Sequence, residues 1–406
     1  MEDVSKSITE LQPLSQLYVL RGSPMEVLPK FFKACKITHL SFEKDDDEYT
    51  ISRDAQITEL AKQAGVEVFA VHGHTMFEGE KVIKINKGKV PTTYAQYEKA
   101  ASALGLPPKP IPSPTALPPP GDIDFTTPLM EAPDVQEYRD RDVNYRNRID
   151  GVADYTYESI AGPGATFSVP TLAELAMQPA STIIRGGERQ ALLVLEEWMT
   201  VRKKEAIYFE KPKTSPAAFK PAESMCFMYT LDYALMSSIL ATVLSPHIKF
   251  GTLSIRTFFW SIQELISKAG DHSKPPVSLL GQITFRDFFH CAQFGTPNFQ
   301  RIRGNPLCRY IDWDLQNQYN SDGTEVKELV ITEENEEANE RFLAWKEGRT
   351  GYPWIDAQMR KLKRDGWIHH LARHSVACFL TRQMYISWER GAEIFDHWLI
   401  DWDPAS

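Results

Sequence analysis

The sequence predicts an α/β domain with a doubly wound parallel sheet, followed by an all-α domain. In residues 16–72 short β-branched runs alternate with amphipathic helical segments, which is the order of elements that builds a parallel sheet. A proline-dense segment follows at 106–134, and from residue 172 onward the pattern is helical with few strand signals. With 406 residues, the chain is long enough for two domains with separate cores.

The first domain is predicted at residues 1–105. Within it we expect strands at 16–20, 38–42 and 66–71 and helices at 24–35 and 55–65. Neither a Gly-x-Gly-x-x-Gly motif nor a Walker loop occurs, so this sheet has no sequence signal for a dinucleotide or a phosphate cradle.

A linker is predicted at residues 106–170, and the helical domain at 171–406. Proline removes backbone donors and favours extended structure, so the prolines at 107, 108, 110, 112, 114 and 118–120 indicate a connector that crosses a surface. A further helix is predicted to open at Arg185–Leu192.

Composition limits the function classes. The net charge of −9 excludes non-specific binding of a polyanion by the whole molecule, so contact with nucleic acid needs a local basic patch. The five cysteines are scattered without a Cys-x-x-Cys pair, which favours free thiols and no metal site. The amino end is polar, and the apolar run Cys226–Leu244 contains Asp232, so we expect no signal peptide and no membrane span.

One helical face carries the strongest functional signal. His370, Arg373 and His374 stand at positions i, i+3 and i+4, so all three lie on the same face of a predicted helix. Core packing explains such a face poorly, because every buried imidazole needs a hydrogen-bond partner. The pattern therefore indicates a site that handles protons or charge.

Thr242-Val243-Leu244-Ser245 comes before Pro246, and this run has two interpretations. Free amides and hydroxyl groups at a helix start bind phosphate, so Thr242 and Ser245 could hold a pyrophosphate. A simple helix cap with Pro246 in the first turn explains the same residues, and it is the better interpretation when the motif is considered alone.

Several segments together resemble a known family. They are Gly281–Phe289, Gly304–Trp313, Trp345–Leu380 and Ile386–Gly391, and the histidine helix lies within the third. They are similar to the flavin domain of the photolyase and cryptochrome family, and in particular to its eukaryotic (6-4) photolyase and animal-type cryptochrome branch. The ending at 401–406 and Phe285 resemble the fungal members.

The resemblance implies FAD as the cofactor in the helical domain. By position, the residues that would bind it are Thr242, Val243, Leu244, Ser245, Gln282, Arg286, His370, Arg373, Asp401 and Asp403. For either carboxylate taken alone, a solvated helix end is the simpler explanation. A second antenna chromophore, a folate or a deazaflavin, is also typical of the family.

The resemblance also implies roles in catalysis. His370 and His374 match the histidine pair of the (6-4) branch, with His370 as proton donor to the lesion, while Gln282 and Phe285 would contact that lesion. Trp388 and Trp313 match electron-transfer residues. For Trp345, Trp354 and Trp367, packing in a helical core is at least as good an interpretation.

Compared with the family, three departures are expected. The chain lacks the opening strand and first helix, so an antenna chromophore is not expected to bind. An anomalous insert occupies 225–241, which we interpret as a retained intron or a gene-model error. The sequence stops at Ser406, before a segment that completes the flavin pocket in the family. We therefore expect both domains to be incomplete, because the chain is truncated at its two ends.

Two functions remain open on this evidence, beside a third interpretation of the chain as a non-functional fragment, which the missing first strand and terminal helices favour. The first is that of a lyase: FAD-dependent, blue-light-driven repair of (6-4) photoproducts in UV-damaged DNA. The alternative is a cryptochrome that signals through light-signalling or clock proteins without repair. For either we expect a soluble, monomeric protein of the nucleus or cytoplasm.

Overall fold

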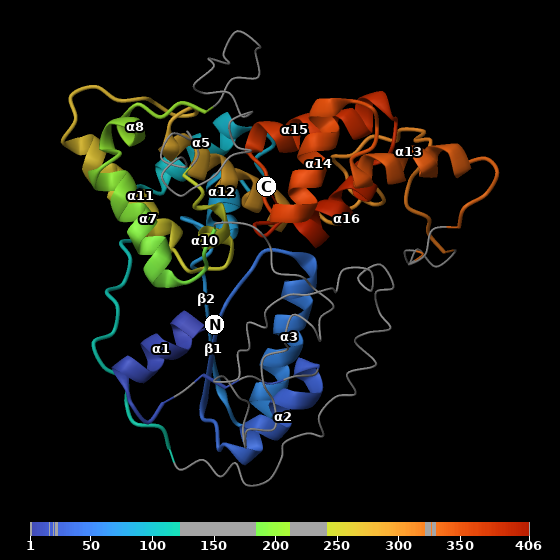
Figure 1. Cartoon of the computed structure of the whole chain (residues 1–406). Helices are drawn as coiled ribbons and strands as arrows, with labels where there is room; N and C mark the ends of the chain where they lie inside the picture. The colour runs from blue at the N-terminus through green and yellow to red at the C-terminus, as the bar shows by residue number, and fades with distance from the viewer. Residues whose placement is uncertain are drawn as a thin grey trace, which may run out of the picture. The chain divides into compact units, whose positions relative to one another are not determined.

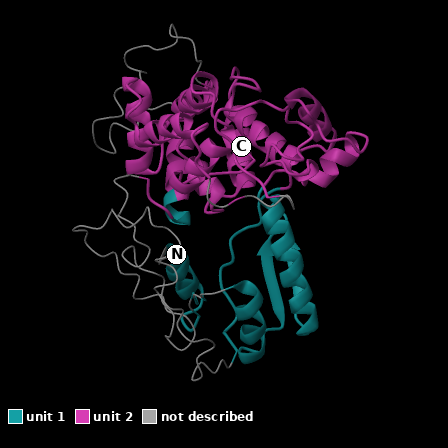
Figure 2. Cartoon of the chain, turned by 90° about the vertical axis from the view of Figure 1, so that its right-hand side faces the viewer, with its two compact units in different colours: residues 1–74, 109–179, 187–190 teal, residues 75–108, 180–186, 191–406 magenta. Residues whose placement is uncertain are grey.

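The computed structural model describes residues 2–121 without 16, 19, 21 and 22, residues 184–211, and residues 242–405 without 321–325 and 327–329. The chain forms two compact units, shown in Figure 2. The first contains residues 1–74, 109–179 and 187–190, and the second contains 75–108, 180–186 and 191–406. The predicted boundary after residue 105 falls inside the second unit, while the boundary at 170 and the insert at 225–241 lie outside the described residues.

The first unit contains a parallel β-sheet, as the sequence predicts. Strand β1 (His39–Glu43) pairs with β2 (Glu67–Val71), and His39 lies opposite Glu67. Helix α3 (Glu48–Gln63) is the crossover between them, and it packs on α2 (Pro24–Ala34) and on β2 (Figure 1). The core of this unit consists of Phe32, Ala61 and Val66, with Leu28, Phe31, Ile37, Leu40 and Val68 packed around them.

The strand predicted at 16–20 is wrong. Its described residues, Leu17, Tyr18 and Leu20, are not in a strand, and the sheet among the described residues has two strands. An apolar run shows that a segment can be extended, but a strand forms only when a neighbouring strand supplies hydrogen-bond partners. The chain instead begins with a helix, α1 (Glu2–Leu11), which the sequence analysis did not predict.

Helix α3 starts seven residues earlier than the predicted helix at 55–65. Its N-cap is Asp47, whose side chain accepts a hydrogen bond from the backbone N–H of Thr50 at 2.9 Å. An aspartate at this position satisfies one of the free amides in the first turn. The cap therefore extends the helix through Thr50 and Ile51, although such β-branched residues are weaker helix formers.

The second unit is built from helices, as predicted for the carboxyl half of the chain. The sequence analysis did not anticipate α4 and α5, which precede the predicted linker. The helices are α4 (Gly79–Ile85), α5 (Tyr94–Ala103), α7 (Glu188–Thr200), α8 (Lys203–Ile207), α10 (Ser245–Lys249), α11 (Ile255–Ser267), α12 (Leu279–Gly295), α13 (Glu336–Glu347), α14 (Pro353–Asp365), α15 (His370–Cys378), the π-helical turn η5 (Phe379–Gln383) and α16 (Trp388–Trp398).

Helix α12 links two hydrophobic clusters of the second unit. Leu279 and Ile283 near its start pack with residues of α7, α8, α10 and α11, whereas Phe288 and Cys291 further along pack with α4 and α5. The helix therefore lies among α4, α5 and α11 (Figure 1), and apolar residues pack between it and these helices. A polar side chain on such a helix is positioned rigidly by the packing around it.

A third cluster joins α13, α14, α15 and α16. Trp345 is fully buried in it, and its indole Nε1 donates to the carbonyl oxygen of Val376 at 3.0 Å. The prediction that Trp345 packs in a helical core is thus confirmed. Trp354 packs against the same cluster from a half-buried position.

Two further findings bear on the sequence predictions. The four cysteines among the described residues, Cys35, Cys291, Cys308 and Cys378, are free thiols, as predicted. Among the described helices, none has the length and apolar character needed to cross a membrane.

Candidate functional site

The predicted histidine helix forms. Helix α14 ends at Asp365, its C-cap Gly366 has the left-handed φ of +69°, and α15 then begins at His370. His370 and His374 are exposed and Arg373 is half-buried between them, so the three residues share one face as predicted. His374 lies against the thiol of Cys378, with 3.8 Å between Nδ1 and Sγ.

His369 has a structural role that the sequence analysis missed. Its Nδ1 accepts a hydrogen bond from the backbone N–H of Leu371 at 3.2 Å, so the imidazole caps α15. Burial, together with the charges of His370 and Arg373, lowers the pKa of His369 to about 4. The ring is therefore neutral at physiological pH, which leaves Nδ1 free to accept.

Arg373 is the centre of a network that joins three segments of the second unit. Its Nη2 donates to Oδ2 of Asp401 at 2.9 Å, and its Nε donates to the carbonyl oxygen of Ile368 at 2.9 Å. The hydroxyl of Ser245 donates to the same Oδ2 of Asp401 at 2.5 Å. Three predicted cofactor residues, at positions 245, 373 and 401, are thus brought together from α10, α15 and the carboxyl end.

A second network surrounds Asp403. Its Oδ2 lies 3.0 Å from Nε2 of His290 and 3.7 Å from Nη2 of Arg286, and its Oδ1 accepts from the backbone N–H of Ala405 at 2.9 Å. Burial alone would raise the pKa of Asp403. The hydrogen bond and charge of His290, with Arg286 and Lys249, reverse that effect and hold the pKa well below its usual range.

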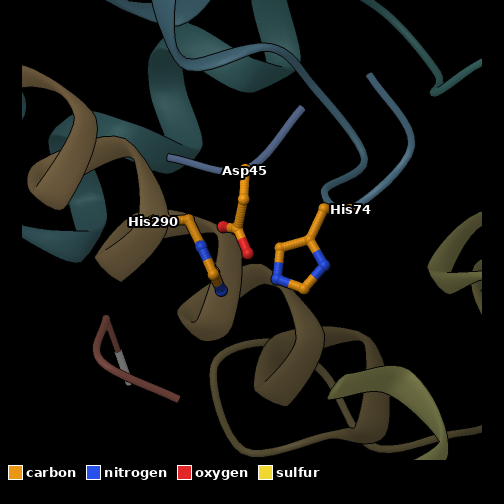
Figure 3. A group of neighbouring side chains, drawn as sticks. All are labelled: Asp45, His74 and His290. Atoms are coloured by element: carbon orange, nitrogen blue, oxygen red, sulfur yellow. The ribbon is translucent and has the colours of Figure 1, made fainter. Parts of the chain in front are cut away.

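Figure 3 shows the His290 side chain projecting from its helix, α12. The other labelled residues, Asp45 and His74, belong to the first compact unit, whereas His290 belongs to the second. The three side chains therefore come from two separate units.

The residues around Arg373 fit a flavin cofactor. Within the described part of the chain, Oδ1 of Asp401 and Nε1 of Trp367 are buried without a hydrogen-bond partner. The guanidinium of Arg373 lies beside both residues, bonded to Asp401 and 5.8 Å from the centre of the Trp367 ring. A flavin ring edge offers both N–H donors and carbonyl acceptors, which are the partners that an unpaired acceptor and an unpaired donor need.

The segment Thr242–Ser245 has an unusual backbone. Val243 has a φ of +53°, a conformation that is a genuine outlier for a β-branched residue and costs about 1–3 kcal/mol. Leu244 is fully buried, and its N–H donates to Oγ1 of Thr242 at 3.4 Å. Because Ser245 uses its hydroxyl proton on Asp401, its side chain offers only lone pairs to any further partner.

The predicted lesion residues lie on α12. Gln282 donates from Nε2 to the carbonyl oxygen of Pro276 at 2.9 Å. Phe285 is half-buried and stacks on Tyr94, with ring centres 4.3 Å apart and planes 23° apart. The Nζ of Lys211 lies 5.7 Å from the centre of the Phe285 ring. One aromatic face is therefore occupied by Tyr94, and a cation lies close to the pair.

The surroundings of His370 favour its neutral form. Partial burial, Arg373, His374 and Lys211 all lower the pKa of His370 below its ordinary value, in that order of importance. Lys211 thus lies close enough to influence His370 while also contacting Phe285. At neutral pH the free protein holds His370 mainly as an uncharged imidazole.

The predicted electron-transfer residues are half-buried. Trp388 is the first residue of α16, and the Trp313 ring packs against Tyr385 with ring centres 5.4 Å apart. An isolated parallel bridge pairs Leu315 with Ile386, between these two tryptophans in sequence. The bridge fixes the segment of Trp313 relative to the start of α16.

Asp287 is a buried titratable residue that the sequence analysis did not single out. Its Oδ2 accepts from the backbone N–H of Met76 at 2.7 Å and from the hydroxyl of Tyr97 at 3.4 Å. Burial raises the pKa of Asp287 to about 7, although Arg286 and the hydrogen bonds oppose that change. A sequence signal existed, because Asp287 stands four residues after the core residue Ile283 and so shares its helical face.

Comparison with known families matches both ends of the chain. A profile described as the FAD binding domain of DNA photolyase matches residues 279–406, which include α12, α15 and the carboxylates Asp401 and Asp403. A second profile, described as DNA photolyase, matches residues 1–115, which include the parallel sheet.

Individual relatives agree with the family profiles. Cryptochrome-2 of Gallus gallus is 36% identical over 411 residues, covering 99% of this chain and 57% of that protein. The (6-4)DNA photolyase of Oryza sativa subsp. japonica is 38% identical over 414 residues, covering 100% and 61%. The crystal structure of the Synechocystis sp. PCC6803 cryptochrome matches with a TM-score of 0.67 and 18% identity, covering 100% of this chain and 67% of that one, and so supports the fold.

The chain spans about 57–61% of the length of these two sequence relatives. Both relatives align along nearly the whole of it, and the two profiles match its sheet domain and its helical domain. The chain therefore belongs to the photolyase and cryptochrome family of FAD-binding flavoproteins.

Proposed function

We propose that this chain carries the flavin site of a light-driven enzyme that repairs (6-4) photoproducts in DNA. The observation that supports this most strongly is the arrangement on α15. The exposed His370 and His374 flank Arg373, whose bonded partner Asp401 and stacked partner Trp367 each keep one buried polar atom unpaired among the described residues. A proton-handling surface thus adjoins a polar site suited to a flavin.

Arg373, Asp401 and Ser245 would hold one side of the cofactor, and Arg286 and Asp403 would hold another. Bound reduced FAD would supply the light-driven electron, which returns when the lesion is repaired, so the net reaction needs no oxidant or reductant. The protein's own contribution is to fix charges around the cofactor before it binds. Fixed dipoles and charges in a water-poor site act strongly because they need no reorganisation.

Phe285, Tyr94 and Lys211 would receive the damaged base. An extrahelical base gains stacking energy on an aromatic ring, and a lysine beside the ring attracts the phosphate that accompanies the base. Lys211 lies 5.7 Å from the Phe285 ring and also acts on His370, so a base at this ring would approach His370. This geometry supports UV-damaged DNA as the partner.

His370 would donate a proton to the lesion. Its pKa is lowered in the free protein, so the imidazole must gain a proton when negative charge arrives. The phosphates of bound DNA and the charge on an electron-bearing lesion would both raise the pKa of His370. We therefore expect the repair rate to fall as the pH rises through the pKa that His370 has in the DNA complex.

The first test is His370→Ala in the FAD-loaded chain. Repair of an oligonucleotide with a single (6-4) photoproduct under blue light should fall at least about a hundredfold, because general-acid catalysis by one side chain contributes roughly that much. FAD occupancy, measured by visible absorption, should stay close to wild type. His397→Ala, which removes an exposed histidine at the end of α16, serves as the matched control and should repair normally. Equal repair by the two variants would exclude His370 as the donor.

A cryptochrome-type signalling function is the second candidate. Two observations favour it: relatives named cryptochrome are 35–36% identical to this chain, and the lowered pKa of His370 opposes proton donation. In that case the FAD-loaded chain would absorb blue light but leave the (6-4) photoproduct intact at every pH between 6 and 8. Measurable repair at any of these pH values would decide for the lyase.

A further inference from the structure

His290 is a buried histidine of the Asp403 network. It lies outside helix α15, and it is not among the site residues predicted from the sequence. It projects from α12, has a side-chain exposure of 1%, and its Nε2 lies 3.0 Å from Oδ2 of Asp403 (Figure 3). We propose that His290 is a positioning residue that holds the Asp403 carboxylate in a fixed orientation for flavin binding. This inference rests on the proposed function.

Asp403 needs such a support because its segment is irregular. The residues from Leu399 to Ala405 belong to no helix or strand, so no helical ladder fixes the carboxylate. Its two oxygens are fixed separately: Oδ1 accepts from the Ala405 backbone, and Oδ2 pairs with His290. Arg286 lies further away at 3.7 Å, outside hydrogen-bond distance.

The helix that carries His290 is well suited to this task. Leu279, Ile283, Phe288 and Cys291 of α12 pack into two hydrophobic clusters, so the helix cannot turn or shift easily. A hydrogen bond from such a helix transmits its rigidity to Asp403. Groups that orient a functional side chain in this way are known to affect binding strongly in other sites.

His290 also opposes the cost of burying Asp403. Among the influences that keep the carboxylate ionised, the hydrogen bond and charge of His290 are the largest, followed by Arg286 and Lys249. Removing His290 would leave a buried carboxylate with weaker compensation. The Asp403 side chain would then turn, or take up a proton, and in either case the flavin site would lose a fixed negative charge.

The two carboxylates near the carboxyl end thus have separate side-chain partners. Arg373 holds Asp401 at 2.9 Å, and His290 holds Asp403 at 3.0 Å. The residues come from α15 and α12, so the two carboxylates, only two residues apart, are anchored to different helices. This division predicts that a change at His290 acts through Asp403 and leaves the Arg373 network in place.

The test is titration of the apoprotein with FAD in the dark, with binding measured by flavin fluorescence. His290→Phe should raise the Kd for FAD at least about tenfold, whereas His290→Gln, which keeps an N–H donor, should stay closer to wild type. In the Asp403→Asn background, His290→Phe should cause no further loss, because its partner is already removed. His247→Gln is the matched control: this histidine is equally buried, but its Nδ1 lies 3.0 Å from the hydroxyl of Thr252.

The possible results distinguish a failure of the proposed flavin site from a failure of the proposed role of His290. A wild-type chain that binds no FAD would overturn the proposed flavin site, and the role of His290 with it. Wild-type binding with an unchanged Kd in His290→Phe would overturn only the inference. The same holds if the loss is equally large in the Asp403→Asn background, since His290 would then act as an ordinary core residue. Should His290→Phe fail to unfold cooperatively, the comparison of His290→Gln with and without Asp403→Asn decides the question.

Discussion

Asp287 and His369 are buried residues whose titration acts on stability in opposite directions. The pKa of Asp287 is raised to about 7, so the folded chain holds a proton on it that the unfolded chain has released. The pKa of His369 is lowered to about 4, so the folded chain lacks a proton that the unfolded chain binds. The stability contribution of Asp287 is thus lost as the pH rises, and that of His369 is lost as the pH falls.

Asp287→Asn tests the first of these effects. Between pH 4 and 7 the folded state binds more protons at Asp287, so stability falls as pH rises, by up to about 1.4 kcal/mol per pH unit. An asparagine keeps the acceptor for Met76 and does not titrate. Urea unfolding at pH 5 and pH 7.5 should therefore show the variant gaining stability relative to wild type at the higher pH. An identical difference at the two pH values would contradict the assignment.

At the scale of the element, α15 depends on its cap. His369→Asn replaces the imidazole by a side chain that also accepts from the Leu371 N–H but does not titrate. Wild type should lose stability as the pH falls from about 6.5 towards 4, because unfolding lets His369 take up a proton. The variant should lose less over the same range, when melting temperatures at pH 7.5 and pH 5 are compared. His369→Ala should cost about 1 kcal/mol at pH 7.5, through loss of the cap.

The turn between α13 and α14 gives a second test at this scale. Gly348 and Gly351 both have positive φ, at +67° and +85°. A Cβ at Gly348 would lie 2.6 Å from the carbonyl oxygen of Asp356, whereas a Cβ at Gly351 would meet nothing within 4 Å. Gly351→Ala should cost about 1–2 kcal/mol from backbone strain alone, and Gly348→Ala clearly more. Chemical denaturation of both variants compares them directly, and equal costs would show that the turn moves away from the clash.

The elements also show what the sequence could predict. Helical spacing was informative for α15, whose face residues lie where the i, i+3, i+4 pattern placed them. The alternation of short apolar runs with helical segments was informative for the parallel pairing of β1 with β2. The same reasoning failed at 16–20, because a strand depends on a neighbour that the run itself does not encode. Local pattern therefore predicts a helix better than a strand.

At the scale of the whole molecule, the site depends on contacts across long stretches of sequence. Ser245 meets Asp401 across 156 residues, and His290 meets Asp403 across 113 residues. Local sequence could nominate Arg373 through its helical spacing, and the resemblance added Ser245, Asp401 and Asp403. Neither the spacing nor the resemblance could predict which of these side chains contact one another. Those contacts depend on how α10, α12, α15 and the carboxyl end pack. His290 was missed for the same reason, since a lone histidine on a mostly apolar helix carries no pattern.

The central claim is that the polar groups around Arg373 and Asp403 form a flavin site. The most direct measurement is titration of the purified apoprotein with FAD, using flavin fluorescence and the visible absorption of the complex. We expect saturable binding close to one FAD per chain, and a higher melting temperature as free FAD exceeds its Kd. We also expect Arg373→Ala, which leaves Asp401 with Ser245 alone, to weaken binding at least about tenfold. A folded chain that binds no FAD, or binds it equally well after Arg373→Ala, would show that these polar groups do not form a flavin site.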